Sequence, residues 1–78
     1  MATLRLFASI REAAATSSVE IDASTIGEVV RVASERFGPS FGELVPTCRV
    51  WCNGEPAFAD DPVGPDDEVA LLPPVSGG

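Results

Sequence analysis

The residues of this sequence with the most distinctive chemistry are the last two, Gly77 and Gly78, which follow Pro73-Pro74-Val75-Ser76. A carboxylate on Gly78 is ionised at neutral pH, because the reference pKa of a terminal carboxyl is about 3.5. It can attack the α-phosphate of ATP and form an acyl-adenylate, from which a sulfur nucleophile then displaces AMP. The tail therefore predicts a thiocarboxylate carrier in which Gly78 is the reacting residue.

The predicted tail comprises residues 73–78 and leaves the body directly after Leu72. Two prolines stiffen the exit and cannot extend a strand ladder. Six extended residues reach roughly 20 Å. Val75, Ser76 and Gly77 form the predicted arm behind Gly78, and glycines without a Cβ fit a narrow channel. We expect a flexible tail, the alternative being that the two glycines are a frayed end without function.

The two cysteines, Cys48 and Cys52, are the other candidates for covalent chemistry. If both lie in one strand, their Cα atoms are roughly 13 Å apart, too far for a disulfide. The chain has no histidine, and two thiols fall short of the usual zinc ligand set. We therefore expect reduced thiols and no metal site.

Charge and hydropathy restrict the possible partners. The formal net charge is −7, from 12 acids against 5 basic residues, and this sign repels nucleic acid. It favours docking onto a basic partner surface, or only keeps a small protein in solution. No secretory signal and no apolar run of membrane-spanning length is recognisable, so we expect a cytoplasmic protein without a membrane partner.

The first half of the sequence predicts a hairpin and one main helix. Residues 3–7 alternate as a strand, and Val19 and Ile21 mark a second strand after a connection that has room for a helical turn at residues 11–14. Thr25 and Glu28 fit a reciprocal capping box. An apolar stripe then follows at helical spacing, up to a stop at Gly38-Pro39. That stripe comprises Ile26, Val29, Val30, Ala33 and Phe37.

The second half predicts the remaining strands. Residues 41–45 suit a short helical turn, and residues 49–52 read as a strand that runs into an Asn53-Gly54 hairpin signal. Residues 55–67 hold three prolines and many acids, which indicates mostly loop. Residues 69–72 are continuously apolar, as expected for a strand in the middle of a sheet.

These elements predict an α+β fold of the β-grasp, ubiquitin-like type in a single domain, residues 1–72. One main helix would lie across a mixed sheet of four or five strands. The strands would contribute Leu4, Leu6, Val19, Ile21, Val50 and Leu71 to a core shared with the helix stripe. A chain of 78 residues has no room for a deep active site beside that core, which favours a module that acts with a larger partner.

The chain resembles a known family at both ends. Residues 67–78, read as DEVALLPPVSGG, look like the C-terminus of the small, MoaD-type subunit of molybdopterin synthase. Leu6-Phe7-Ala8 followed by Ile10-Arg11-Glu12 is similar to the start of the same family. The match is specific at the tail and diffuse in the middle of the chain.

The resemblance implies a pathway. A MoeB-type activating enzyme would use ATP to adenylate Gly78, and a sulfurtransferase system would convert it to the thiocarboxylate. The tail would enter the large, MoaE-type synthase subunit and pass sulfur to cyclic pyranopterin monophosphate in molybdenum cofactor biosynthesis. The chain itself would bind no cofactor, and the catalytic acids and bases would belong to the large subunit. It would thus be a non-catalytic sulfur donor.

The resemblance also assigns a partner-binding surface. The apolar docking residues it implies are Phe7, Leu72, Pro73, Pro74 and Val75, and Arg11 would contact the activating enzyme. Trp51 departs from the small apolar residue expected at its position. With Arg49 it falls on the strand face opposite Val50, where it would enlarge the docking patch or only cover a sheet edge. The alternative for Phe7 and Leu72 is that they are core residues, and for Arg11 that it is only a solvated charge.

Three other functions stay open. The same carrier chemistry could serve thiamine, cysteine or tRNA thiolation. A ubiquitin-like modifier would instead join Gly78 to lysines of target proteins. A passive interaction domain would not use the tail at all.

Overall fold

The computed structural model describes residues 1–74 of the 78-residue chain. Val75, Ser76, Gly77 and Gly78, which hold the predicted reactive carboxylate and most of the predicted arm, lie outside the described residues. The elements, in chain order, are β1 (Ala2–Leu6), α1 (Ala8–Ala14), β2 (Ser18–Ile21), α2 (Ile26–Phe37), α3 (Pro39–Leu44), a 3₁₀ turn (Val45–Thr47), β3 (Arg49–Cys52), β4 (Glu55–Pro56) and β5 (Glu68–Leu72). Within residues 1–74, no helix combines the length and hydropathy that crossing a membrane requires.

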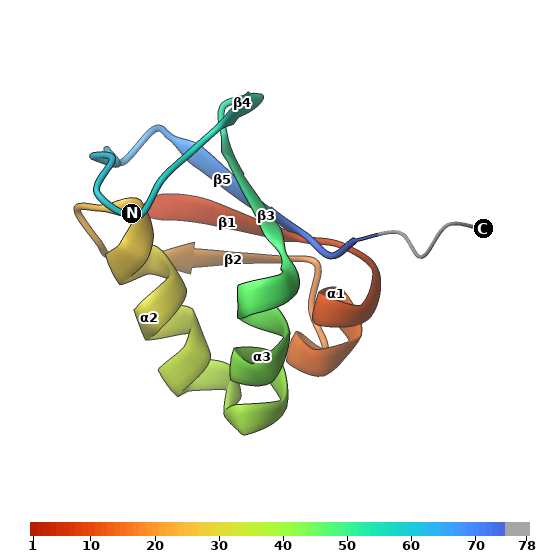
Figure 1. The fold of residues 1–78 in the computed structure, drawn as a ribbon. Helices are drawn as coiled ribbons and strands as arrows, with labels where there is room; N and C mark the ends of the chain where they lie inside the picture. Colours follow the sequence, from red (N-terminus) through yellow and green to blue (C-terminus); the bar gives the residue numbers. More distant parts are fainter. Residues whose placement is uncertain (75–78) are drawn as a thin grey trace.

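The strands form one mixed five-stranded sheet in the order β2-β1-β5-β3-β4. β5 is central, parallel to β1 and antiparallel to β3, and the remaining pairs are antiparallel. This order confirms the predicted β-grasp arrangement. All the helices lie on one side of the sheet, and β5 points toward the tail exit (Figure 1).

The core lies between the sheet and the helices. Strand alternation sends every second residue toward the helices, and Leu4, Leu6, Val69 and Leu71 are at most 1% exposed. From the helix side, Ile26, Val29 and Ala33 of the predicted stripe are buried, whereas Val30 and Phe37 are half-buried. Val19 and Val50 are likewise only half-buried and pack against the core edge.

The connecting segments are more helical than the sequence predicts. Residues 11–14 belong to a complete helix, α1, whose Ile10 is fully buried. The predicted turn at residues 41–45 is helix α3 followed by a 3₁₀ turn, and Phe41 fills the core with its ring 5.1 Å from that of Phe37. Gly38 joins α2 to α3 at φ +90°, a conformation that L side chains rarely adopt.

The start of α2 corrects one detail of the predicted capping box. The Thr25 hydroxyl accepts the Glu28 N–H at 3.2 Å, as predicted. The Glu28 carboxylate reaches past Thr25, however, and accepts the Ser24 N–H at 2.7 Å. Thr25 lies opposite Pro62 in an isolated bridge to the acidic loop of residues 55–67, which is held by the Ile26 N–H to the Asp61 carbonyl at 3.0 Å and the Val63 N–H to the Ser24 carbonyl at 2.9 Å.

The β3–β4 turn matches its sequence signal. Asn53 and Gly54 have φ +52° and +85°, the positive values that a two-residue hairpin turn needs. The side chain of Asn53 makes both bonds: its Nδ2 donates to Asp67 Oδ1 at 2.9 Å, and its Oδ1 accepts the Glu68 N–H at 2.9 Å. This Asn53–Asp67 clasp ties the hairpin to the start of β5 and fixes the register of the central strand.

Candidate functional site

The last strand divides two neighbouring leucines between opposite faces of the sheet. In β5, Leu71 points into the core and is 0% exposed, while Leu72 is half-buried on the face without helices. On that open face Leu72 lies opposite Arg49, and Ala70 lies opposite Trp51. The predicted placement of Trp51 and Arg49 opposite Val50 is therefore correct.

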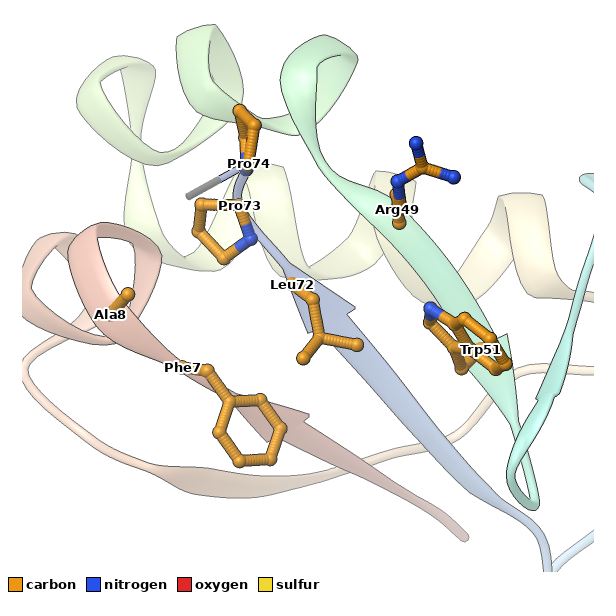
Figure 2. A pocket seen from close by; sticks show the side chains of 7 residues that line it. All are labelled: Phe7, Ala8, Arg49, Trp51, Leu72, Pro73 and Pro74. Atoms are coloured by element: carbon orange, nitrogen blue, oxygen red, sulfur yellow. The ribbon is translucent and has the colours of Figure 1, made fainter. Parts of the chain in front are cut away.

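An apolar groove opens on this face where the tail leaves the sheet. It encloses about 560 Å³ and is lined by Phe7, Ala8, Arg49, Trp51, Leu72, Pro73 and Pro74. Figure 2 shows Leu72 between Phe7 on one side and Trp51 on the other, with Arg49 toward the proline end. We call this the docking groove. It unites all the predicted partner-binding residues within residues 1–74 except Arg11.

Strand alternation places Phe7 on the open face, one residue past the end of β1. Arg5 is exposed, Leu6 is buried, and Phe7 is the last extended residue (φ −135°, ψ 155°) before α1. The chain then turns sharply at Ala8, whose φ of +51° is uncommon for a residue with a Cβ. The Phe7 side chain is 39% exposed and lines the groove with Leu72, so Phe7 is neither a strand residue nor a core residue.

Arg11 lies apart from the docking groove. It is exposed in the last turn of α1 and does not line the groove. Its predicted contact with an activating enzyme therefore stays a prediction. Ala8 is the groove residue that the sequence reasoning missed. In the sequence Ala8 is only part of the Leu6-Phe7-Ala8 motif, and its outward position depends on the backbone turn at its φ of +51°.

The cysteines take no part in the groove. Cys48 precedes β3 instead of lying within it, which corrects the prediction of one shared strand, and Cys52 ends β3. Both are free and half-buried. Burial raises the pKa of each thiol, and for Cys52 the carboxylates of Asp67 and Asp61 raise it further. Both are thus protonated at neutral pH and poor nucleophiles.

The described part of the chain carries binding surface but little reactive chemistry. Across residues 1–74 no three Cys, Asp or Glu side chains gather as a metal site would require. The groove has one charged side chain, Arg49, amid apolar ones. Pro73 and Pro74 lie at its upper end and lead to the predicted tail (Figure 2). The arrangement can seat an apolar partner surface at the root of the tail.

A five-stranded β-grasp sheet with an open apolar groove beside the exit of its last strand defines a ubiquitin-like protein. A model of the ThiS family matches residues 4–78. The small archaeal modifier protein 1 of Haloferax volcanii is 35% identical, over 95% of this chain and 97% of that protein. The chain therefore belongs to the ThiS family of ubiquitin-like sulfur carriers.

Solved structures agree with this assignment. The crystal structure of the Haloferax volcanii protein has a TM-score of 0.77 and 34% identity, covering 99% of this chain and 98% of that one. A chain of the complex of subunits 1 and 2 of molybdopterin-converting factor from Helicobacter pylori gives a TM-score of 0.73 and 24% identity over 99% and 97% of the two chains. The Amycolatopsis orientalis BexX/CysO complex gives 0.85 and 22% over 100% of both. These last two likenesses show the fold.

Proposed function

We propose that this chain is the sulfur-donating small subunit of a molybdopterin synthase. Its Gly78 carboxylate would be adenylated by an ATP-dependent activating enzyme and converted to a thiocarboxylate. The sulfur would then pass to cyclic pyranopterin monophosphate inside a large synthase subunit. The observation that carries the proposal is the docking groove at the root of the predicted tail, which suits a partner that must take up both.

In each proposed step this chain supplies the reacting carboxyl group, and its partners supply the catalytic residues. A carboxylate oxygen of Gly78 attacks the α-phosphate of ATP, and pyrophosphate leaves. A sulfur nucleophile adds to the acyl carbon of the adenylate, and AMP departs with its electron pair, which leaves the thiocarboxylate. Phe7, Trp51 and Leu72 would hold the body against the partner, so that the arm starts from a fixed point.

Support for the molybdopterin acceptor comes from two directions. The tail sequence resembles that of the molybdopterin synthase small subunit. A Helicobacter pylori chain of the same fold belongs to the complex of subunits 1 and 2 of molybdopterin-converting factor. An acidic body also suits a basic partner surface, since complementary charge speeds and orients encounter.

The test begins with the intact mass of the chain purified from its native host, with fragmentation to place any change. We expect an oxygen-for-sulfur increment confined to Gly78. The thiocarboxylated chain, mixed with the large subunit from the same genome and pyranopterin precursor, should yield molybdopterin. A variant that lacks Gly77 and Gly78 is the control and should fold normally but transfer no sulfur. A tail that stays a carboxylate with ATP, activating enzyme and sulfur donor supplied would refute the carrier function.

Protein modification is the second candidate, favoured by the 35% identity to a protein named as a modifier. The same adenylate would then be attacked by a lysine amine of a target protein, with AMP as the leaving group. This chain contains no lysine, so it cannot build chains on its own side chains. Modification would appear as single-step adducts on other proteins, and their absence in the native host would exclude it. Thiamine, cysteine or tRNA thiolation stays an alternative outcome of the transfer assay, because the carrier chemistry is the same.

A further inference from the structure

Arg49 is the single charged residue of the docking groove. Its neighbours across and along the sheet are Leu72 and Trp51, both apolar. Among residues 1–74, no acidic side chain lines the groove or forms an ion pair with Arg49. A guanidinium in such a setting keeps its hydrogen-bonding capacity for an incoming group.

Three other arginines of the chain are engaged, whereas Arg11, which lies outside the groove, has no side-chain partner among residues 1–74. Arg5 pairs with Glu68 at 3.3 Å on the same open face. Arg31 pairs with Glu35 at 2.9 Å and lies 3.9 Å from Glu28. The Arg36 guanidinium donates to the Glu20 carbonyl at 3.4 Å. Because Glu68 is already paired with Arg5, the nearest acid of β5 does not compensate Arg49.

The groove is also opposite in charge to the rest of the molecule. The chain has 12 acids and a net charge of −7, yet the groove displays a positive group. Half of these acids, Glu55, Asp60, Asp61, Asp66, Asp67 and Glu68, lie between β3 and the start of β5, at the far end of β5 from Pro73. A partner that is basic toward the body must therefore carry the opposite charge at the groove.

We propose that the protein surface seated in the docking groove presents a carboxylate to Arg49 and an apolar pocket to Trp51. Docking would remove water around the pair, and Arg offers a planar fork that binds a carboxylate through two hydrogen bonds. A single carboxylate in an otherwise basic partner surface fixes the orientation of this chain. In a rotated pose, that carboxylate would meet the acidic loop of residues 55–67 and be repelled. The partner's identity rests on the proposed function, whereas its chemistry at the groove does not.

The first test uses the chain alone with two small probes. Phenylacetate combines an aromatic ring with a carboxylate, and phenethylamine has a similar ring with the opposite charge. Trp51 is the only tryptophan, so its indole N–H signal in NMR reports the groove directly. Phenylacetate should shift this signal more strongly than phenethylamine at equal concentration, and Arg49→Gln should remove the difference. Equal shifts from the two probes in the native chain would overturn the inference.

The second test measures binding to the large synthase subunit from the same genome, with Trp51 fluorescence as the signal. Arg49→Gln should weaken binding by at least about 30-fold, because an interfacial charge loses its partner. Arg49→Lys should lose less. The matched control is Arg31→Gln, the same charge change on helix α2, and it should bind like the native chain.

The outcomes separate the inference from the proposed function. If the native chain binds the large subunit and Arg49→Gln binds equally well, the inference is wrong and the proposed function stands. If the native chain does not bind the large subunit but still selects phenylacetate through Arg49, the proposed function is wrong. The groove chemistry then holds for another acidic and apolar partner surface.

Discussion

The two faces of the sheet use apolar residues for different purposes. The face toward the helices buries Leu4, Leu6, Val69 and Leu71 almost completely. The open face carries Leu72 and Trp51 half-buried, with Phe7 39% exposed beside them. Nothing in residues 1–74 covers the docking groove. The difference between adjacent residues of β5 teaches that only the first face is needed to fold the domain, while the second is available for a partner.

Paired substitutions of neighbouring leucines give the largest expected difference. Leu71→Ala should lower the free energy of unfolding by about 3 kcal/mol, because it opens a cavity in the core. That is a large share of the roughly 4–12 kcal/mol expected for a domain of this size. Leu72→Ala should cost less, about 1 kcal/mol, because its side chain is already partly exposed to water and its loss opens no closed cavity. Urea unfolding followed by circular dichroism measures both, and equal losses would contradict the division between the faces.

Substitution of the groove tryptophan should separate binding from stability. Trp51→Ala should weaken binding to the large subunit by about 2 kcal/mol, as for an aromatic anchor at the centre of an interface. Its effect on unfolding should be smaller than that of Leu71→Ala. Phe58→Ala is the matched control, because Phe58 is an aromatic residue that is 73% exposed outside the groove. If Phe58→Ala weakens binding as much, the interface does not lie at the docking groove.

Acid should weaken the Asn53–Asp67 clasp, which ties the β3–β4 hairpin to the start of β5. Hydrogen bonds from the Gly64 N–H at 2.7 Å and the Asn53 amide at 2.9 Å lower the pKa of Asp67 below its ordinary value. The ionised form is therefore favoured by folding. Its stabilisation is present above the unfolded-state pKa of about 3.9 and is lost as the pH falls through the lower folded value.

The corresponding experiment compares acid unfolding of three chains. Asp67→Asn should show a smaller loss of stability below about pH 4 than the native chain. Asp66→Asn is the matched control, because it removes the adjacent exposed carboxylate, which takes no part in the hydrogen bonds of the clasp. A one-residue slip of β5 would exchange Leu71 and Leu72 between the two faces of the sheet. Hydrogen exchange of the β5 backbone amides can detect such a slip when the clasp is weakened. An unchanged acid slope in Asp67→Asn would mean that the clasp does not depend on this carboxylate.

Much of the sheet was predictable because its signals are local. Alternation predicted β1 and the open-face positions of Arg49 and Trp51, and Asn53-Gly54 predicted the hairpin. The capping residue Thr25 also located the start of α2. Each of these follows from the geometry of a few neighbouring residues.

The parts that were not predicted depend on contacts between distant segments. Ile10 and Phe41 are core residues because α1 packs against β5 and α3, and α3 packs against α2, and neither short helix has a long apolar repeat. The turn at Ala8 has a positive φ, which an alanine in the sequence does not predict. The second half of the capping box differs because Ser24 offers the Glu28 carboxylate both its N–H and its hydroxyl. The chemistry predicted for Gly78 lies beyond the described residues and stays a prediction.

The parallel pairing of β1 with β5 has a mechanical consequence. The chain enters this pair at Ala2 and leaves it after Leu72, at the opposite end of the sheet (Figure 1). A force that pulls these two points apart runs along the strands, whereas the ladder hydrogen bonds lie across them. Such a force would load all the hydrogen bonds between β1 and β5 at the same time, instead of breaking them one after another. A partner that draws in the tail would thus pull against a clamp, and the body would resist unravelling while its arm is held.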